Sequence, residues 1–121
     1  MGMKRQGKKG KQGRRAIVVL VTAASERQAV RIGRALVGAE LAACVNIVRG
    51  VCSIYRWGGK VVQDREVLLV LKSRADLFNR LAKEVKRLHS YQVPEVIAFP
   101  IAQGAHDYLA WIMKSTCKSL K

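Results

Sequence analysis

The sequence is poor in the residues that usually carry catalysis, metal binding or covalent cross-links. Its 121 residues include only eight acidic residues, two histidines and three cysteines. The cysteines Cys44, Cys52 and Cys117 are odd in number and widely spaced. Neither a disulfide framework nor a C-x-x-C zinc or redox motif is therefore expected. A reducing compartment, the cytoplasm, fits this cysteine usage.

Long apolar runs and enzyme signatures are also missing. No apolar run approaches the eighteen or so residues that a membrane span needs, and the N-terminus has no apolar signal-peptide core. The chain has no G-x-x-x-x-G-K-S/T loop, no G-x-S-x-G turn and no cluster of carboxylates, so we expect no enzymatic activity. The fairest enzymatic alternative is an acylphosphatase-like phosphate cradle at residues 22–25 with Arg27, which has weak support.

Positive charge is abundant and unevenly placed. The formal net charge is +15, and residues 1–15 contain seven Lys or Arg side chains and no acidic residue. Such a segment cannot bury enough apolar area to offset its ordering entropy. We therefore predict a disordered basic tail over residues 1–15 and one folded domain over residues 16–121. The tail suits non-specific contact with nucleic acid or another polyanion, or it only keeps the protein soluble.

The remaining sequence alternates between strand and helix patterns. Strands are expected over residues 16–22, 43–57, 61–72 and 96–101, and helices over residues 25–40, from a Ser73 cap to Leu88, and over 105–114. Gly58 and Gly59 supply a hairpin turn between the two middle strands. This order predicts an α+β, ferredoxin-like split βαβ fold (β-α-β-β-α-β plus a C-terminal helix) with an antiparallel sheet and both main helices on one face.

One face of this sheet is predicted to be uncovered. The apolar side chains expected on it lie around Val45, Ile47, Val51, Leu69 and Leu71. An open apolar face of this kind favours association. The long hairpin that ends in Tyr55 and Trp57 adds a second surface for contact between copies. The sequence therefore predicts self-assembly.

Six segments between residues 17 and 112 carry a family resemblance. They read VLVTA, LAACVNIV, SIYRWGGK, EVLLVLKS, LHSYQVPEVIAFPI and DYLAWI, and in order and spacing they resemble the CutA divalent-cation-tolerance family. The resemblance implies a ferredoxin-like protomer that forms a compact homotrimer, similar in architecture to nitrogen-regulatory signal-transducer trimers, with strand edges of neighbouring protomers paired. It also implies a non-enzymatic role linked to tolerance of divalent metals, and some members of the family bind copper.

The resemblance leaves one candidate metal ligand. In copper-binding relatives the site resembles a cysteine near the end of the first strand plus a His-His pair after the second helix. The corresponding positions here are Val21 and His89-Ser90, so His89 is the candidate ligand for copper(II) or another divalent cation. A single imidazole gives a weak site. Cys44 and Cys52 lie in apolar strands, where free cysteines are usually buried, and His106 is expected to be an exposed residue at the start of the last helix.

A second candidate site combines Trp57, Lys72, Tyr91 and Glu95. These residues fall at predicted strand ends, where a cleft between protomers could gather them. The Lys72 ammonium and the Tyr91 hydroxyl would suit a small anion or carboxylate, with Trp57 as an apolar wall. The alternative is structural: the aromatic residues anchor an interface and a Lys–Glu pair seals it.

Two functions remain open at this point. The first is a cytoplasmic, non-enzymatic homotrimer that takes part in divalent-metal tolerance and binds a metal or a small ligand between protomers. The second is a basic trimeric scaffold that binds polyanions through its N-terminal tails, because three weak arms on one particle reinforce each other.

Overall fold

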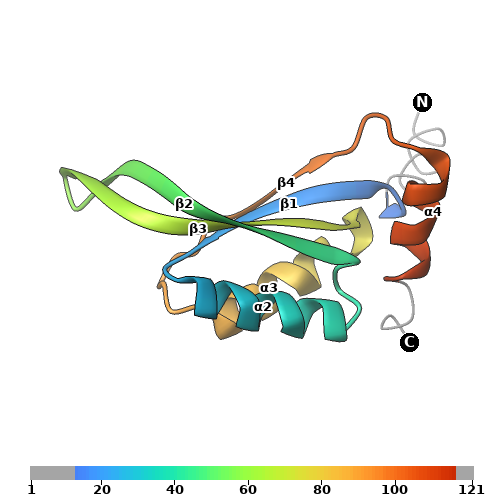
Figure 1. Cartoon of the computed structure of the whole chain (residues 1–121), viewed down its shortest axis with the longest axis horizontal. Coiled ribbons are helices and arrows are strands. Elements are labelled where there is room, and N and C mark those ends of the chain that lie inside the picture. Colours follow the sequence, from blue (N-terminus) through green and yellow to red (C-terminus); the bar gives the residue numbers. More distant parts are fainter. Residues whose placement is uncertain (1–12, 117–121) are drawn as a thin grey trace, which may run out of the picture.

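The computed structural model of the chain describes residues 13–116, which form a sheet and a layer of helices (Figure 1). The strands are β1 (Ala16–Ala23), β2 (Cys44–Trp57), β3 (Lys60–Arg74) and β4 (Val96–Pro100). The helices are α2 (Glu26–Gly38), the short 3-10 helix η1 (Ala75–Leu77), α3 (Phe78–Leu88) and α4 (His106–Lys114). The predicted order of elements is confirmed. Most of the predicted basic tail lies outside the described residues.

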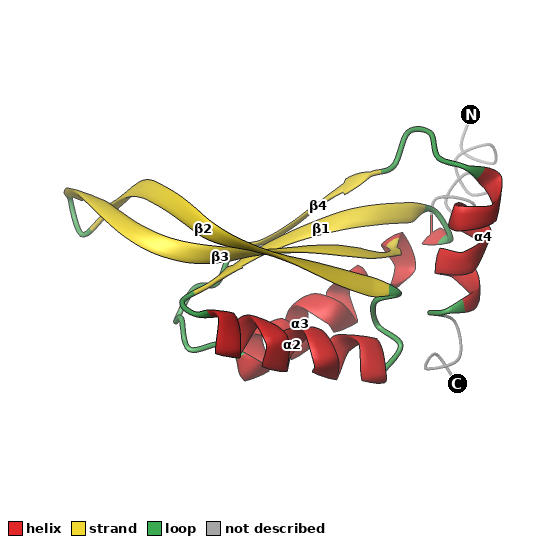
Figure 2. Ribbon diagram, in the orientation of Figure 1, coloured by secondary structure: helices red, strands yellow, loops and turns green. Residues whose placement is uncertain are grey.

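The sheet is antiparallel throughout and has the strand order β2-β3-β1-β4. Helices α2 and α3 lie on the same face of the sheet, while α4 packs at the end opposite the β2–β3 turn (Figure 2). This is the predicted ferredoxin-like arrangement, in which each β-α-β unit returns its helix to the same side.

The core lies between the sheet and the helices α2 and α3. The Ser25 hydroxyl accepts a hydrogen bond of 3.1 Å from the backbone N–H of Gln28, which is the predicted cap of α2. From α2, Ala29, Ile32 and Leu36 are fully buried against the strands. From α3 and the turn before it, the residues that the sequence places on one apolar stripe reach the same core, namely Leu77, Phe78, Leu81, Val85 and Leu88.

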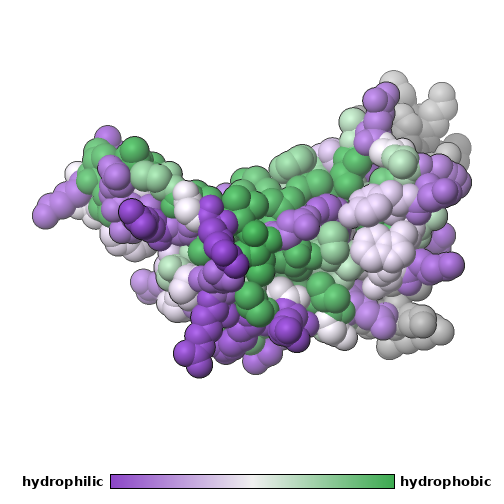
Figure 3. Space-filling view, viewed as in Figure 1, coloured by the Kyte–Doolittle hydropathy of each residue, from purple (hydrophilic) through white to green (hydrophobic). Residues whose placement is uncertain are grey.

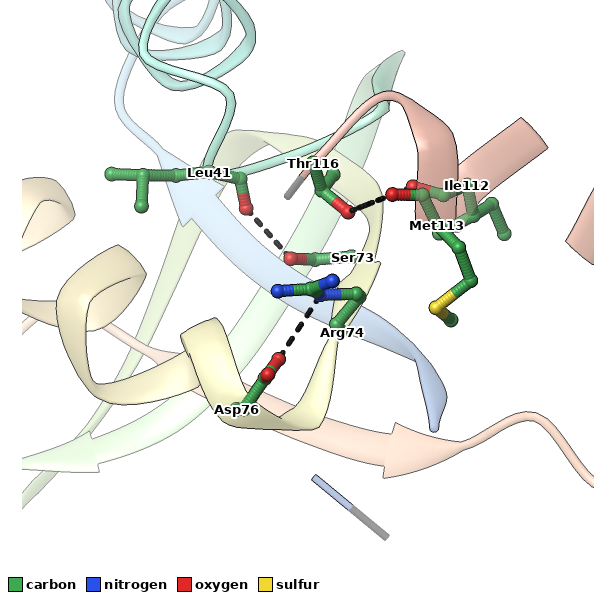
Figure 4. A network of polar contacts seen from close by, with 7 residues as sticks. All are labelled: Leu41, Ser73, Arg74, Asp76, Ile112, Met113 and Thr116. Carbon is green, nitrogen blue, oxygen red and sulfur yellow. Dashed lines mark hydrogen bonds and ion pairs between the residues drawn. The ribbon is translucent and has the colours of Figure 1, made fainter. Parts of the chain in front are cut away.

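The predicted Ser73 cap is wrong. Strand β3 continues to Arg74, and the fully buried Ser73 donates its hydroxyl hydrogen to the carbonyl oxygen of Leu41 at 2.6 Å (Figure 4). That carbonyl follows the end of α2, so the bond ties a connecting loop to the sheet. The helical segment begins at η1 without a side-chain cap, and the Arg74 guanidinium lies 3.1 Å from the Asp76 carboxylate instead.

The sheet has an uncovered face, as predicted. Of the five residues predicted on it, only Val51 lies on that side, in the hairpin beyond a bulge in β2. Leu69 and Leu71 are fully buried under the helices, where Val45 and Ile47 also pack. The uncovered face consists of their alternate neighbours, which are Val18, Leu20, Val48, Leu68, Val70, Ile97 and Phe99. Since side chains alternate across a strand, a frame error of one residue reverses the face. Strand β1 is likewise buried on one side only, since Val18 and Leu20 are half-buried.

The space-filling view shows where this apolar surface gathers. Hydrophobic residues form a band across the middle of the molecule, over the strands (Figure 3). On the uncovered face, Val48, Ile97 and Phe99 are each exposed by 45–51%. Apolar exposure concentrated on one face marks an interaction surface.

The β2–β3 hairpin projects beyond the helices (Figure 1). Its turn places Gly58 at φ 58° and Gly59 at φ 78°, which is the left-handed pair that a two-residue hairpin requires. A bulge interrupts the ladder between Val48 and Val51, where Gly50 has φ 71°. Cys52 lies beyond the bulge and is exposed, contrary to the expected burial, since only β3 flanks this part of β2.

Candidate functional site

A cleft of about 520 Å³ opens between the hairpin and the loop of residues 89–95. Its wall contains two carboxylates and three aromatic rings, contributed by Glu66, Glu95, Tyr55, Trp57 and Tyr91. Thr22, Ser53, Ile54 and Val93 complete the wall. The cleft is thus built from the end of β1, from both strands of the hairpin and from the loop before β4.

The bulge in β2 decides which hairpin residues reach this cleft. Val48 pairs with Leu68, and Val51 pairs with Glu66, so β2 has one residue more than β3 in this interval. The extra residue reverses the alternation of side chains along β2. As a result, Ser53, Tyr55 and Trp57 lie on the side of Glu66, which is the side of the uncovered face. Val51 also follows this second frame, which explains why it faces away from the helices.

Glu66 and Tyr91 form the innermost polar pair. The Tyr91 hydroxyl donates a hydrogen bond of 2.7 Å to Oε2 of Glu66. Glu66 is only 9% exposed. Burial and this hydrogen bond to Glu66 raise the pKa of Tyr91 above its ordinary value. The hydroxyl therefore stays protonated and remains a donor at neutral pH.

His89 fixes the loop that carries Tyr91. The backbone N–H of Tyr91 donates to Nδ1 of His89 at 3.0 Å, so the ring proton resides on Nε2, which donates to the carbonyl oxygen of Thr22 at 2.7 Å. The His89 and Tyr91 rings also lie in contact, with centroids 4.5 Å apart. Both imidazole nitrogens are thus engaged with the main chain. A metal ion would have to displace one of these bonds to use His89 as a ligand.

The electrostatic character of the cleft is negative. Glu66 and Glu95 are the charged side chains in its wall, and no Lys or Arg among the described residues lines it. Behind this wall, the Tyr55 hydroxyl donates a hydrogen bond to the Asp64 carboxylate, which raises the pKa of Tyr55. The chain has 23 Lys and Arg residues, so the cleft is a negatively charged region on a basic protein.

The structure brings together Trp57, Tyr91 and Glu95 but not Lys72. Lys72 is six residues from Glu66 along β3, a separation of about 20 Å in an extended strand. It lies opposite Cys44 and donates a hydrogen bond to the side-chain oxygen of Asn46. Within one chain, Lys72 is therefore separate from this cleft. That Lys72 joins the other three residues in a cleft between protomers, where they would bind a small anion or carboxylate, stays a prediction.

Glu66 and Tyr55 were not among the sequence-predicted site residues. Glu66 could have been found as the acidic residue directly before the apolar run VLLVL of β3. A carboxylate at the edge of a buried strand is uncommon without a partner. Tyr55 could not have been placed, since its orientation depends on the bulge.

Few other groups could bind a metal. Among residues 13–116 there is no cluster of three or more His, Cys, Asp or Glu side chains in a ligating arrangement. Cys44 is half-buried, with its sulfur 3.6 Å from the Tyr108 hydroxyl. His106 is exposed at the start of α4, as expected. Helices long and apolar enough to cross a membrane are also absent from the described part of the chain.

Comparisons with known proteins agree on one family. The family model described as "CutA1 divalent ion tolerance protein" matches residues 17–115. The divalent-cation tolerance protein CutA of Thermus thermophilus is 52% identical over 99 residues, which are 82% of this chain and 96% of that protein. The solved structure of the Thermus thermophilus Cut A1 protein has 51% identity and a TM-score of 0.83, and the match covers 84% of this chain and 99% of that one.

A plant relative shows the same match within a longer protein. The rice protein named "Protein CutA 1, chloroplastic" is 46% identical over 104 residues, which are 86% of this chain but only 59% of the rice protein. The match to the family model covers nearly all of the described domain, and the bacterial relative matches over almost its whole length. The chain therefore belongs to the CutA1 divalent ion tolerance family.

Proposed function

We propose that this chain forms a non-enzymatic homotrimer that binds copper(II) or another divalent cation weakly in the cleft, and that it contributes in this way to tolerance of divalent metals. The observation that carries the proposal is the charge of the cleft. Glu66 and Glu95 line it, and none of the described basic side chains does. Cations are therefore concentrated there, although the surface of the chain is mostly positive.

The donor set argues for weak and exchangeable binding. Two carboxylates supply oxygen ligands of the kind that hard divalent ions accept, whereas copper(II) is bound more tightly where imidazole nitrogens are among its donors. His89 supports the site by holding the loop of residues 89–95 against β1. That His89 ligates copper(II) directly stays a prediction from the sequence.

Titration calorimetry on tag-free protein with copper(II) and manganese(II) tests the cation site. Glu66→Gln removes the buried charge while keeping the shape, and is expected to weaken binding of both ions. Cys52→Ser changes an exposed residue on the hairpin and is expected to leave binding unchanged. If Cys52→Ser abolishes binding and Glu66→Gln does not, the ligands lie elsewhere and the proposed site is wrong.

The uncovered face supports the homotrimer. Its seven apolar residues lie on one side of the sheet, and no helix among the described elements covers them. Trp57, with 60% of its surface exposed, extends the apolar surface along the hairpin. Light scattering is expected to give three times the chain mass. Trp57→Ala is expected to weaken assembly by about 2 kcal/mol, and a wild-type monomer at micromolar concentration would refute the proposal.

The basic scaffold remains the second candidate, supported by the seven positive charges of residues 1–15. Deletion of residues 1–14 is expected to leave the melting temperature almost unchanged. It is also expected to lower affinity for heparin and duplex DNA and to flatten the salt dependence, by about 0.9 in the log–log slope for each lost phosphate contact. Unchanged DNA binding would show that the tail is not the polyanion site.

The cytoplasm is the compartment in which we place this function, on the basis of the cysteine usage. The three cysteines have no paired spacing, and of these Cys44 and Cys52 are free thiols in the structure. The rice relative carries the word chloroplastic in its name, which describes that longer protein. Fractionation of the native cells, with an antibody to this chain, would test the compartment.

A further inference from the structure

The chemistry of the cleft is more specific than a simple attraction for positive charge. Glu66 is about nine-tenths buried, and its one hydrogen-bond partner among the described residues is the neutral Tyr91 hydroxyl at Oε2. No ion pair between Glu66 and any described residue is present. The Oε1 atom is not a fully buried atom left without a partner, so it is accessible from the cleft. A ligand that brings a positive charge to this carboxylate would form a charge-assisted hydrogen bond with it.

The rest of the wall is aromatic. Tyr55, Trp57 and Tyr91 are three of the seven Trp, Tyr and Phe residues in the chain, and all three line this one cleft. The faces of such rings attract organic cations, with Trp the strongest. Ile54 and Val93 add apolar surface for an alkyl group. Carboxylate and aromatic groups thus converge on one opening.

A bare metal ion uses only part of this wall. The described residues offer no group of three ligating side chains, so a divalent ion would keep most of its water and gain little from the rings. An alkylammonium ion sheds its water more readily and contacts both the carboxylate and the ring faces. A volume of about 520 Å³ is within the range of small-molecule sites.

We infer that the cleft is a binding site for a small organic ammonium ion, whose charged nitrogen pairs with Glu66 and whose alkyl groups pack against Trp57 and Tyr55. This inference rests on the proposed function, in which the same cleft binds cations, and it names the class of cation that fits best. The small anion that the sequence suggested would instead need Lys72, which within one chain lies far along β3.

Calorimetric titration of the full chain with three probes tests the inference. The probes are tetramethylammonium, n-butylammonium and the neutral 1-butanol. Both ammonium ions are expected to bind, and 1-butanol is expected to bind more weakly or not at all. Equal binding of n-butylammonium and 1-butanol would overturn the inference, since the charge would then contribute nothing.

Three variants test whether ammonium ions bind in the cleft, and they separate the contribution of the carboxylate from that of the aromatic rings. Glu66→Gln is expected to lower ammonium affinity about tenfold or more. Glu84→Gln changes a half-buried carboxylate on α3 that pairs with Arg87, outside the cleft, and as the matched control it is expected to leave ammonium affinity unchanged. Trp57→Leu is expected to lower ammonium affinity about threefold to fivefold and to leave manganese(II) affinity unchanged. If the mass of the Trp57→Leu variant shows that it fails to assemble, Tyr55→Leu is used in its place.

The outcomes distinguish the inference from the function on which it rests. If manganese(II) binds and is lost in Glu66→Gln, but neither ammonium ion binds, the cation site stands and the inference fails. If neither kind of cation binds to folded, correctly assembled protein, both fail. Ammonium binding that Glu66→Gln and Trp57→Leu both leave intact would place the site outside the cleft and would also overturn the inference.

Discussion

The two faces of the sheet are made by the same strands and are similarly apolar, yet only one of them is covered within the protomer. Val19, Val21, Leu69 and Leu71 are fully buried beneath α2 and α3. Their alternate neighbours on β1 and β3 remain half-buried, and Phe99 on β4 is 48% exposed. An antiparallel sheet that has only water on one side usually places polar residues there. The second apolar face therefore favours association, which is the basis of the proposed homotrimer.

The two faces are therefore expected to contribute differently to the stability of the single chain and to the association of copies. Residues under the helices stabilise each protomer at any concentration, whereas residues on the uncovered face contribute more when the copies associate. Substitutions on the two faces should therefore differ in their dependence on protein concentration.

The largest effect is expected for Leu69→Ala. Leu69 is fully buried between the sheet and the helices, so truncation leaves a cavity and should cost about 2–5 kcal/mol of unfolding free energy. Urea denaturation at several protein concentrations measures it. Leu68→Ala is the matched control on the other face, and its cost should be smaller and more dependent on concentration. Equal costs without concentration dependence would contradict the distinction between the faces.

A smaller change in protomer stability, but a large change in mass, is expected for Phe99→Asp. Phe99 lies on the uncovered face of the edge strand β4. A charge there would be desolvated at an interface, so the assembly should dissociate while the far-UV circular dichroism is retained. Sedimentation velocity reports the mass. Val37→Asp places the same charge on an exposed apolar residue of α2 and should leave the mass unchanged. If both variants stay assembled, the uncovered face is not the interface.

The smallest effect is expected for Tyr91→Phe, in the dependence of the unfolding free energy on alkaline pH. The folded-state pKa of Tyr91 is raised above its ordinary value of about 10, so the folded state retains the phenolic proton longer than the unfolded state does. The corresponding stability is present below pH 10 and is lost as the pH rises through the folded-state pKa. Tyr91→Phe removes this group and should make the alkaline loss shallower. An identical pH profile of unfolding free energy would refute the assignment.

Much of the fold was predictable because its signals are local. The Ser25 cap, the Gly58-Gly59 turn and the helical spacing of apolar residues each specify one element, and the element order then restricts the topology. The Ser73 cap failed because a serine that ends a strand resembles a helix cap in sequence. Its actual acceptor, the Leu41 carbonyl, is 32 positions away.

The site was less predictable because its geometry is not local. Within one chain, Trp57, Tyr91 and Glu95 line one cleft, whereas Lys72 lies near the other end of β3. The cleft between protomers that the sequence suggested for all four residues stays a prediction. Four of the five residues assigned to the uncovered face lie on the other face, since an apolar run such as VLLVL gives no indication of its frame, and only Val51 lies on the predicted side. Glu66 has a local sequence signal, as the acidic residue directly before this run, but its hydrogen bond to Tyr91 depends on the fold.

The bulge at Gly50 gives β2 two independent halves for mutation and design. Between Cys44 and Val48, odd-numbered positions belong to the core, and between Val51 and Trp57 they lie on the uncovered side, where Ser53, Tyr55 and Trp57 line the cleft. A substitution pattern inferred for one half is therefore inverted in the other. Removal of a single residue at the bulge would turn Tyr55 and Trp57 to the opposite side of the hairpin without altering any cleft residue. Loop length at this position, rather than residue identity in the cleft, is then the simplest variable by which a related chain could lose the site.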